Sequence, residues 1–382
     1  MQIRLASPAT APELVEELRT AAYVALDTEF HAERRYLPQL YLLQLHVPGG
    51  HAWIVDPLDQ ETLPAIALGL QSCTWLVHSG YQDIRLIQQA IGAVPASVLD
   101  TQVAAGLIGV VYPASYAHLT EMYLGKHLAK TETLSDWSRR PLSRDQLNYA
   151  ADDVLFLPTL WETLLENARQ LKRESAVLPA CLEALEKTLL CPTHWRDVPG
   201  AQGLSPSQAA VLEQVFDWRE TVARESDQPA KAVLPDPLLL EIAKRQPASI
   251  NDLHADRRLP KNLARRWGEE ILQRIHRGLS TEPDQQPRVL GRGTAESRQV
   301  AWLELFAEAL GQTMGFAGRL VLPHRLAEQI VLYKPESRSD LRFALSPWRD
   351  DLIGDQLWAA VNGRINLSIS DFDVRQQVST PP

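Results

Sequence analysis

The first two hundred residues alternate between short apolar runs and amphipathic segments. Five runs have the length and composition of β-strands, at residues 22–30, 39–47, 51–56, 74–79 and 97–101. Helical periodicity covers residues 61–70 and 81–92 and three later stretches, the last of them at about 143–171. Because the strands first follow one another through a turn and then alternate with helices, the pattern predicts a mixed sheet covered by helices, an α/β architecture.

The second half of the chain has helical periodicity and little strand signal. Two segments of similar length each begin with a long periodic helix, at residues 211–227 and 300–315. In each segment a proline follows, Pro235 or Pro323, and then another helical run. Trp218 and Trp302 do not align, so any internal duplication is loose. We predict two small all-helical bundles.

Segments rich in proline, glycine and serine separate these regions, at residues 191–208 and 280–294. They predict three domains and a tail: an α/β domain at 1–195, helical domains at 205–280 and 295–370, and a polar tail at 371–382. A length of 382 residues fits two or three domains. An apolar fraction of 45% with 22% charged residues excludes wholesale disorder.

The cysteines and the apolar segments indicate a cytoplasmic protein. Cys73, Cys181 and Cys191 are odd in number and form no CxxC pair, which argues against a disulfide framework or a zinc module. The N-terminus has no apolar stretch of secretory length, and the longest apolar run, 103–112, is about half a membrane span. We therefore expect a soluble protein of the reducing cytosol, without a membrane partner.

The net charge of −9 at first argues against a nucleic acid partner. The charge is uneven, however. Residues 1–200 contain 15 basic and 23 acidic residues, whereas 241–280 contains nine basic and five acidic ones. The acidic excess therefore belongs to the first domain, and a local basic stretch lies in the second half. This difference predicts domains with different tasks.

Carboxylates occur in the first domain at positions where a core would disfavour them. Asp27 and Glu29 lie two apart in a strand and so project from one face. Asp83 falls in the first turn of the helix after the strand at 74–79. Tyr149 and Asp153, four apart, share a helix face, while Asp152 points elsewhere. Each feature alone has a structural explanation: a solvated strand end, a helix cap, or an exposed pair.

Taken together, the four acids predict a metal site. Converging carboxylates without basic partners repel one another, and hard divalent cations such as Mg²⁺ or Mn²⁺ remove that conflict. Two such ions about 3.5–4 Å apart are the arrangement used for in-line attack on a phosphodiester. Tyr149, one turn from Asp153, is placed to orient the attacking water.

At this point the sequence resembles a known family. LDTEF, HSGYQD followed by LDTQVAA, and YAADDV are similar, in order and spacing, to the three exonuclease motifs of the DEDD superfamily. The tyrosine four before the last aspartate resembles the tyrosine subclass. More narrowly, RRYLPQLYLLQLH and TETLSDWSRRPLSRDQLNYAADDV resemble ribonuclease D. The two helical bundles are similar in position and size to the paired HRDC domains of that family.

The resemblance implies an RNase H-like fold for the first domain. It also implies a 3′→5′ exoribonuclease that hydrolyses RNA ends, typically those of tRNA precursors, and releases nucleoside 5′-monophosphates. Asp27, Glu29, Asp83 and Asp153 match the metal-binding acids, and Tyr149 matches the water-orienting tyrosine. The chain departs from the family at Ala129, where an acid often precedes the residue equivalent to Lys130; that position bears on substrate contacts rather than on activity.

Basic residues of two segments are candidate RNA contacts: Arg139, Arg140, Arg257, Arg258, Lys261, Arg265 and Arg266. A solvated loop around 135–140 and an ordinary charged helical surface are equally good explanations of them. His46 and His78 are better explained as core or surface residues than as catalytic ones. Among the ten tryptophans, those at helical spacing, such as Trp218 and Trp302, are better explained as core than as base-stacking platforms.

Two other functions stay open from the sequence. A DNA 3′→5′ exonuclease would share the same acids, because the residues that read the sugar 2′-hydroxyl cannot be located. A non-catalytic RNA-binding scaffold is the alternative of another class, although the presence of all four acids and Tyr149 counts against it. We expect two divalent ions, no small-molecule cofactor, an RNA partner with a free 3′ end and, for the oligomeric state, a monomer.

Overall fold

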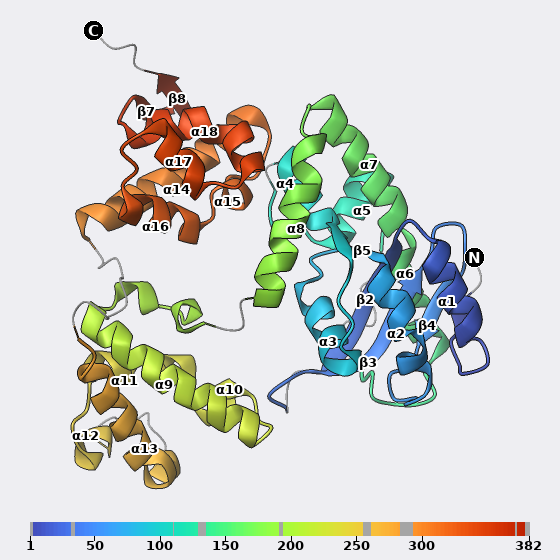
Figure 1. Cartoon of the computed structure of the whole chain (residues 1–382), viewed down its shortest axis with the longest axis horizontal. Coiled ribbons are helices and arrows are strands. Elements are labelled where there is room, and N and C mark those ends of the chain that lie inside the picture. The colour runs from blue at the N-terminus through green and yellow to red at the C-terminus, as the bar shows by residue number, and fades with distance from the viewer. Residues whose placement is uncertain are drawn as a thin grey trace. The chain divides into compact units, whose positions relative to one another are not determined.

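The computed structural model describes residues 3–31, 35–109, 111–128, 135–190, 194–254, 261–282, 293–370 and 373–378 (Figure 1). The chain divides into two compact units. The first unit contains residues 1–31, 40–190 and 300–382, and the second contains residues 32–39 and 191–299. No helix among the described residues has both the length and the apolar character needed to cross a bilayer.

The first unit is built on a six-stranded sheet with the strand order β1-β4-β3-β2-β5-β6. The strands are β1 Ile3–Leu5, β2 Val24–His31, β3 Gln39–His46, β4 Ala52–Val55, β5 Thr74–Val77 and β6 Ser97–Asp100. The β1–β4, β2–β5 and β5–β6 pairs are parallel, whereas β3 and β4 are antiparallel. The predicted mixed sheet is therefore confirmed. The sequence pattern missed β1, whose three residues are too few to establish a period.

Eight helices of the described chain accompany this sheet: α1 Ala11–Thr20, α2 Thr62–Ser72, α3 Tyr81–Ile91, α4 Thr101–Ile108, α5 Tyr116–Leu124, α6 Arg144–Leu155, α7 Leu157–Gln170 and α8 Glu174–Leu190. Among them, α6 packs against β1, β2 and β4, α7 packs against β5, and α8 packs against β6. The single helix predicted at 143–171 is in fact two, α6 and α7. They meet at Phe156, and Pro158, which has no N–H to donate, lies in the first turn of α7.

The two helical bundles repeat one pattern of helices. The first contains α9 Pro206–Glu225, α10 Ala230–Val233, α11 Asp236–Arg245, α12 Ile250–His254 and α13 Lys261–Leu279, after two 3₁₀ turns, η1 Trp195–Asp197 and η2 Ala201–Gly203. The second contains α14 Ala295–Met314, α15 Gly318–Val321, α16 His324–Tyr333, α17 Arg338–Ala344 and α18 Pro347–Val361. In both, helices of 20, 4 and 10 residues follow in the same order. The ten-residue helices start after Pro235 and Pro323, and both end on a residue with positive φ, Gln246 and Lys334.

The C-terminal end of the chain differs from the prediction of helices followed by a polar tail. Residues Ile365–Ser370 form β7, which pairs in antiparallel register with β8, Asp373–Val378. The segment INLSIS alternates apolar and polar residues, which is the period of a strand rather than of a helix.

Buried arginines join the second helical bundle to the α/β part of the first unit. Arg349 of α18, 4% exposed, pairs with Glu183 of α8 and donates to the Val321 carbonyl. The indole of Trp348 donates to the same Glu183 carboxylate at 3.0 Å. Burial alone would raise the pKa of Glu183, but Lys187 and Arg349 lower it to about 2. The pair therefore stabilises the folded chain wherever Glu183 is ionised.

A second arginine ties the same two regions through backbone carbonyls. Arg173, 7% exposed, donates to the carbonyls of Leu107 and Gly315 and also to that of Met314. Nearby, the Ala317 N–H donates to the Gly106 carbonyl at 2.7 Å. A Cβ at Gly106 would lie 2.7 Å from a methyl of Leu320, so the two backbones approach closely only because residue 106 is a glycine. The second bundle and the α/β part therefore share one packed interface.

We expect Arg349→Ala to destabilise the chain because it removes the buried guanidinium that pairs with Glu183 and bonds to the Val321 carbonyl. The free energy of unfolding should fall by about 3 kcal/mol. Arg319→Ala is the matched control, because Arg319 pairs with Glu308 on the exposed surface of the same bundle. That change should cost less than about 1 kcal/mol. Equal losses for the two variants in urea denaturation would contradict this account of the interface.

Candidate active site

The carboxylates of strand β2 begin where its buried part ends. Val24, Ala25 and Leu26 are almost fully buried in the centre of the sheet, and Asp27 and Glu29 follow with partial exposure. Oxygen atoms of Asp27, Glu29 and Asp153 all lie within 4.8 Å of one another. Strand β2 and helix α6 thus bring Asp153 together with two acids that precede it by more than 120 residues in the sequence.

The fourth acid, Asp83, lies beside this cluster. It is 8% exposed in the first turn of α3 and accepts a hydrogen bond from the hydroxyl of Thr28, the residue between the two acids of β2. Asp83 is not one of the three acids whose oxygen atoms lie within 4.8 Å of one another. Its charge nevertheless raises the pKa values of Asp27 and Glu29. All four acids identified in the sequence therefore occupy one region.

The turn that carries Asp83 is held by an acid that sequence reasoning missed. Asp100, 8% exposed at the end of β6, accepts from the N–H of Ser79 at 3.0 Å and of Gly80 at 3.3 Å. It also caps α4 through the N–H of Gln102. Ser79 has a φ of 57°, and a Cβ at Gly80 would lie 2.5 Å from Val77. Asp100 belongs to the LDTQVAA segment of the family resemblance, and its place at a strand-to-helix junction, where N-caps are common, gives it a structural explanation in the sequence.

Burial raises the pKa values of all four acids, and nearby carboxylate charges add to the rise, including Asp100 for Asp83 and Asp152 for Asp153. Burial is the largest cause for each. It acts with the charges of Asp83, Asp153 and Glu29 to raise the pKa of Asp27 well above its usual value. The pKa rises to about 8 for Glu29, about 7 for Asp153 and about 6 for Asp83. This site therefore resists full ionisation unless positive charge enters it.

Helix α6 presents a tyrosine together with its acid. Ser143 and Gln146 form a capping box at its start, which fixes where the helix begins. Tyr149 donates a hydrogen bond to the Asp153 carboxylate, which partly opposes the rise in the pKa of Asp153. The Asp152 side chain is exposed, in agreement with the predicted difference between the two neighbouring aspartates.

Tyr116 of α5 is a second tyrosine near the acids. Its hydroxyl donates to the Asp152 carbonyl at 3.2 Å, and its pKa is raised by burial and by the charges of Asp153 and Asp27. The phenol therefore stays protonated and can act as a hydrogen-bond donor. No sequence signal separates it from an ordinary helical tyrosine.

The candidate RNA contacts fall into two groups. Arg140 directs its five N–H donors to Asp56 and to the carbonyls of Tyr41, Trp137 and Arg139, which speaks against a phosphate contact. Arg139 has an exposed side chain and pairs only at one edge with Asp136.

On α13, Arg265 and Arg266 are exposed. Arg257 and Arg258 lie outside the described residues, as do Ala129 and Lys130, and Lys261 is described only as the first residue of α13.

The structure supports the interpretation of His46, His78 and Trp218 as residues of the fold rather than of the catalytic or RNA-binding site. Both ring nitrogens of His78 contact protein groups, the Thr101 hydroxyl at 2.9 Å and the Ala114 carbonyl at 3.0 Å. His46 is 5% exposed and contacts the His51 carbonyl. Trp218 is 2% exposed in the core of the first bundle. These side chains belong to the packing of the fold.

Comparisons with known proteins agree with the fold and the site described above. A family model for a 3′–5′ exonuclease matches residues 5–168, and one for an HRDC domain matches residues 208–275. Ribonuclease D of Cronobacter turicensis is 30% identical over 354 residues, covering 90% of this chain and 95% of the relative. The chain belongs to the ribonuclease D family.

Further family members support this membership. Ribonuclease D of Gluconacetobacter diazotrophicus is 31% identical and covers 95% of this chain and 93% of the relative. The crystal structure of Escherichia coli RNase D, described as an exoribonuclease involved in structured RNA processing, has a TM-score of 0.77 and 26% identity. It covers 95% of this chain and 99% of that chain. The chain is thus a 3′→5′ exoribonuclease with an RNase H-like exonuclease domain and a C-terminal HRDC region.

The acid cluster suits a divalent metal. Its donors are carboxylate oxygens, which are the ligands that Mg²⁺ and Mn²⁺ prefer, and no cysteine or histidine takes part in the described cluster. The raised pKa values also suit a metal site, because a bound cation would favour the ionised form of each acid. The structure therefore agrees with the divalent-metal dependence of this exonuclease family.

We expect the metal-free protein to lose stability as the pH rises from about 4 to about 8. Across that range the unfolded chain releases protons that Glu29, Asp83 and Asp153 retain in the folded chain, so the folded state is progressively disfavoured. Thermal denaturation in chelator at several pH values measures the slope. Adding Mn²⁺ at pH 8 should restore the melting temperature, because the ion binds only the folded chain.

The variant Asp153→Asn tests whether the acid cluster causes this loss of stability at high pH. It removes one of the repelling charges, so the metal-free variant should be more stable than the unmodified chain at pH 8 by about 1–3 kcal/mol. It should also gain less from Mn²⁺. Asp145→Asn, at an exposed position in the first turn of the same helix, is the control; it should change the stability by less than about 0.5 kcal/mol and leave the gain from Mn²⁺ unchanged. If both variants behaved alike, the stability effect would not arise from the acid cluster.

Proposed function

We propose that this exoribonuclease trims the 3′ ends of structured RNA, including tRNA precursors, by two-metal hydrolysis that releases nucleoside 5′-monophosphates. The observation that carries the proposal is the convergence of Asp27, Glu29 and Asp153 within 4.8 Å, with Asp83 beside them. The tRNA assignment rests on the resemblance to ribonuclease D, and the structured-RNA role described for the Escherichia coli enzyme supports it.

In this proposal Asp27, Glu29, Asp83 and Asp153 hold two divalent ions. When bound, these ions would supply an activated water and stabilise the charge that develops on the leaving 3′ oxygen. The remaining work falls to the chain. Asp100 fixes the turn that carries Asp83, and Thr28 orients the Asp83 carboxylate by a hydrogen bond. Both contacts set ligand geometry before substrate arrives.

Tyr149 would position the attacking water. Its phenol lies on the same face of α6 as Asp153 and is hydrogen-bonded to that carboxylate. The water oxygen adds to phosphorus, the bond from phosphorus to the 3′ oxygen of the preceding nucleotide breaks, and that oxygen takes a proton. The products are a nucleoside 5′-monophosphate and an RNA shortened by one nucleotide with a free 3′ hydroxyl.

The remaining assignments extend the same proposal. We propose domain boundaries at 1–195, 205–280 and 295–370, and the matches at 5–168 and 208–275 lie inside the first two. A cytoplasmic location fits an RNA substrate and the free, buried thiols of Cys73 and Cys181. A monomer acting without a small-molecule cofactor completes the proposal, and light scattering measures that oligomeric state.

We expect Asp27→Ala to abolish Mg²⁺- or Mn²⁺-dependent trimming of a 3′-tailed RNA while the fold is retained, because the cluster loses its central ligand. Tyr149→Phe should lower kcat by about 10²-fold, with little change in KM, because it removes only the water-orienting hydroxyl. Asp145→Asn, at an exposed position in the first turn of the same helix, should remain close to the unmodified enzyme. Product chromatography measures the released 5′-monophosphates.

The same assay separates the alternatives. RNA and DNA oligomers of matched sequence should differ, with RNA trimmed faster. Equal or faster trimming of DNA would favour the DNA exonuclease, and metal binding without hydrolysis would favour the scaffold. Unchanged turnover in Asp27→Ala would contradict the assignment of the acid cluster as the catalytic site.

A further inference from the structure

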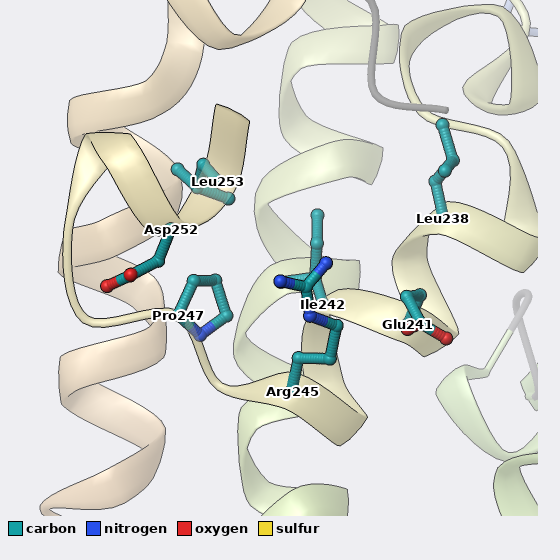
Figure 2. Close-up of a pocket in the computed structure, with 7 residues that line it drawn as sticks. All are labelled: Leu238, Glu241, Ile242, Arg245, Pro247, Asp252 and Leu253. Carbon is teal, nitrogen blue, oxygen red and sulfur yellow. The ribbon is translucent and has the colours of Figure 1, made fainter. Parts of the chain in front are cut away.

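The first helical bundle contains hollows of different size and chemistry. One lies between α11 and α12, where Leu238, Ile242 and Leu253 form apolar walls and Arg245 and Asp252 lie at the edge (Figure 2). It holds only about 10 Å³, roughly the space of a single water molecule. This hollow is too small for a ligand.

A larger hollow of about 200 Å³ lies among α9, α10 and α13, the helices drawn together in Figure 1. Its apolar walls come from Val222 on α9, Val233 on α10 and Leu263 on α13. Its polar lining comes from residues that are exposed or partly exposed: Ser226, Gln228, Arg266 and Trp267. We call this hollow the α9–α13 pocket.

Trp267 and Arg266, which both line the pocket, contact each other. The Arg266 guanidinium lies 4.7 Å from the centre of the Trp267 ring, in cation–π geometry. Trp267 is fixed from behind by Trp218, whose ring meets it edge-on at 5.9 Å. Trp218 is in turn held by a hydrogen bond from its indole to Glu270 at 2.9 Å. The pocket therefore has an aromatic wall braced by Trp218 and an exposed cationic side chain beside it.

Two side chains of the pocket keep unused hydrogen-bonding capacity. Within the described residues, Arg266 makes no ion pair or hydrogen bond besides its contact with Trp267. The side-chain amide of Gln228 likewise has no hydrogen-bond partner among those residues, whereas its backbone N–H is bonded to Ala223. An amide offers one donor and one acceptor side by side, as the edge of a nucleobase requires.

We propose that the α9–α13 pocket binds one unpaired nucleobase of the RNA substrate, an inference that rests on the proposed action on structured RNA. A nucleobase has apolar faces, a polar edge and an attached anionic phosphate. The pocket offers a complement to each: apolar walls with Trp267, the Gln228 amide and the Arg266 guanidinium. An apolar peptide side chain would use the walls but would leave the amide and the guanidinium without partners.

The experiment measures RNA binding by the full chain carrying Asp27→Ala, so that the RNA is not consumed. The probe is a fluorescent hairpin RNA with a single-stranded 3′ tail, followed by anisotropy. Arg266→Lys keeps the charge but removes the planar group, and Gln228→Ala removes the amide. Arg265→Lys is the matched control, because Arg265 is exposed on the same helix but does not line the pocket.

Arg266→Lys and Gln228→Ala should each weaken binding by about 5–20-fold, as expected for loss of one base contact, and Arg265→Lys by less than about twofold. Both pocket residues are exposed at the surface, so melting temperatures should stay unchanged. With hairpins that carry one abasic site at successive unpaired positions, a single position should reproduce the loss. At that position Arg266→Lys should cause no further weakening.

Equal effects of Arg266→Lys and Arg265→Lys would overturn the proposal, because only charge would then matter. Abasic sites without effect at every position would also overturn it, as would binding of an apolar peptide that RNA does not displace. Trimming by the same variants with Asp27 intact keeps this outcome separate from the proposed function. If RNA is trimmed but pocket variants bind it normally, only the pocket assignment fails.

Discussion

The repulsion among four clustered carboxylates, Asp27, Glu29, Asp83 and Asp153, is the constraint on which the rest of this structure depends. The charges of Asp83 and Asp153 raise the pKa values of Asp27 and Glu29, and no basic side chain belongs to the described cluster. A core would not accumulate such charge without a compensating gain. Divalent cations supply that gain, and the family's nuclease chemistry uses the same ions, so an electrostatically unfavourable part of the fold is also its functional part.

The surrounding elements hold the acids in place against this repulsion. Strand β2 lies inside the sheet between β3 and β5, so Asp27 and Glu29 extend from a rigid base. Asp100 ties the turn before α3, and the capping box at Ser143 fixes the start of α6 and hence the position of Asp153. These contacts hold the acids whether or not a ligand is bound, which is how a site can be preorganised before metal and RNA arrive.

Sequence periodicity predicted those parts of the site that depend on local geometry. Alternation along β2 placed Asp27 and Glu29 on one face, and the four-residue spacing placed Tyr149 with Asp153. Contacts made only by tertiary folding escaped it. Asp100 and Tyr116 reach the site from elements whose sequences resemble ordinary helix starts.

The same limit explains the errors. The helix expected at 143–171 divides at Phe156, and the C-terminal strand pair was predicted as helix and tail. Arg140, a candidate RNA contact, pairs with Asp56, which lies 84 residues away in the sequence. The most direct test of the metal account is anomalous diffraction from crystals of the full chain grown with Mn²⁺. We predict two Mn²⁺ positions about 3.5–4 Å apart, with oxygen ligands from Asp27, Glu29, Asp83 and Asp153. Anomalous peaks only at other residues, or none at these four acids, would contradict the account.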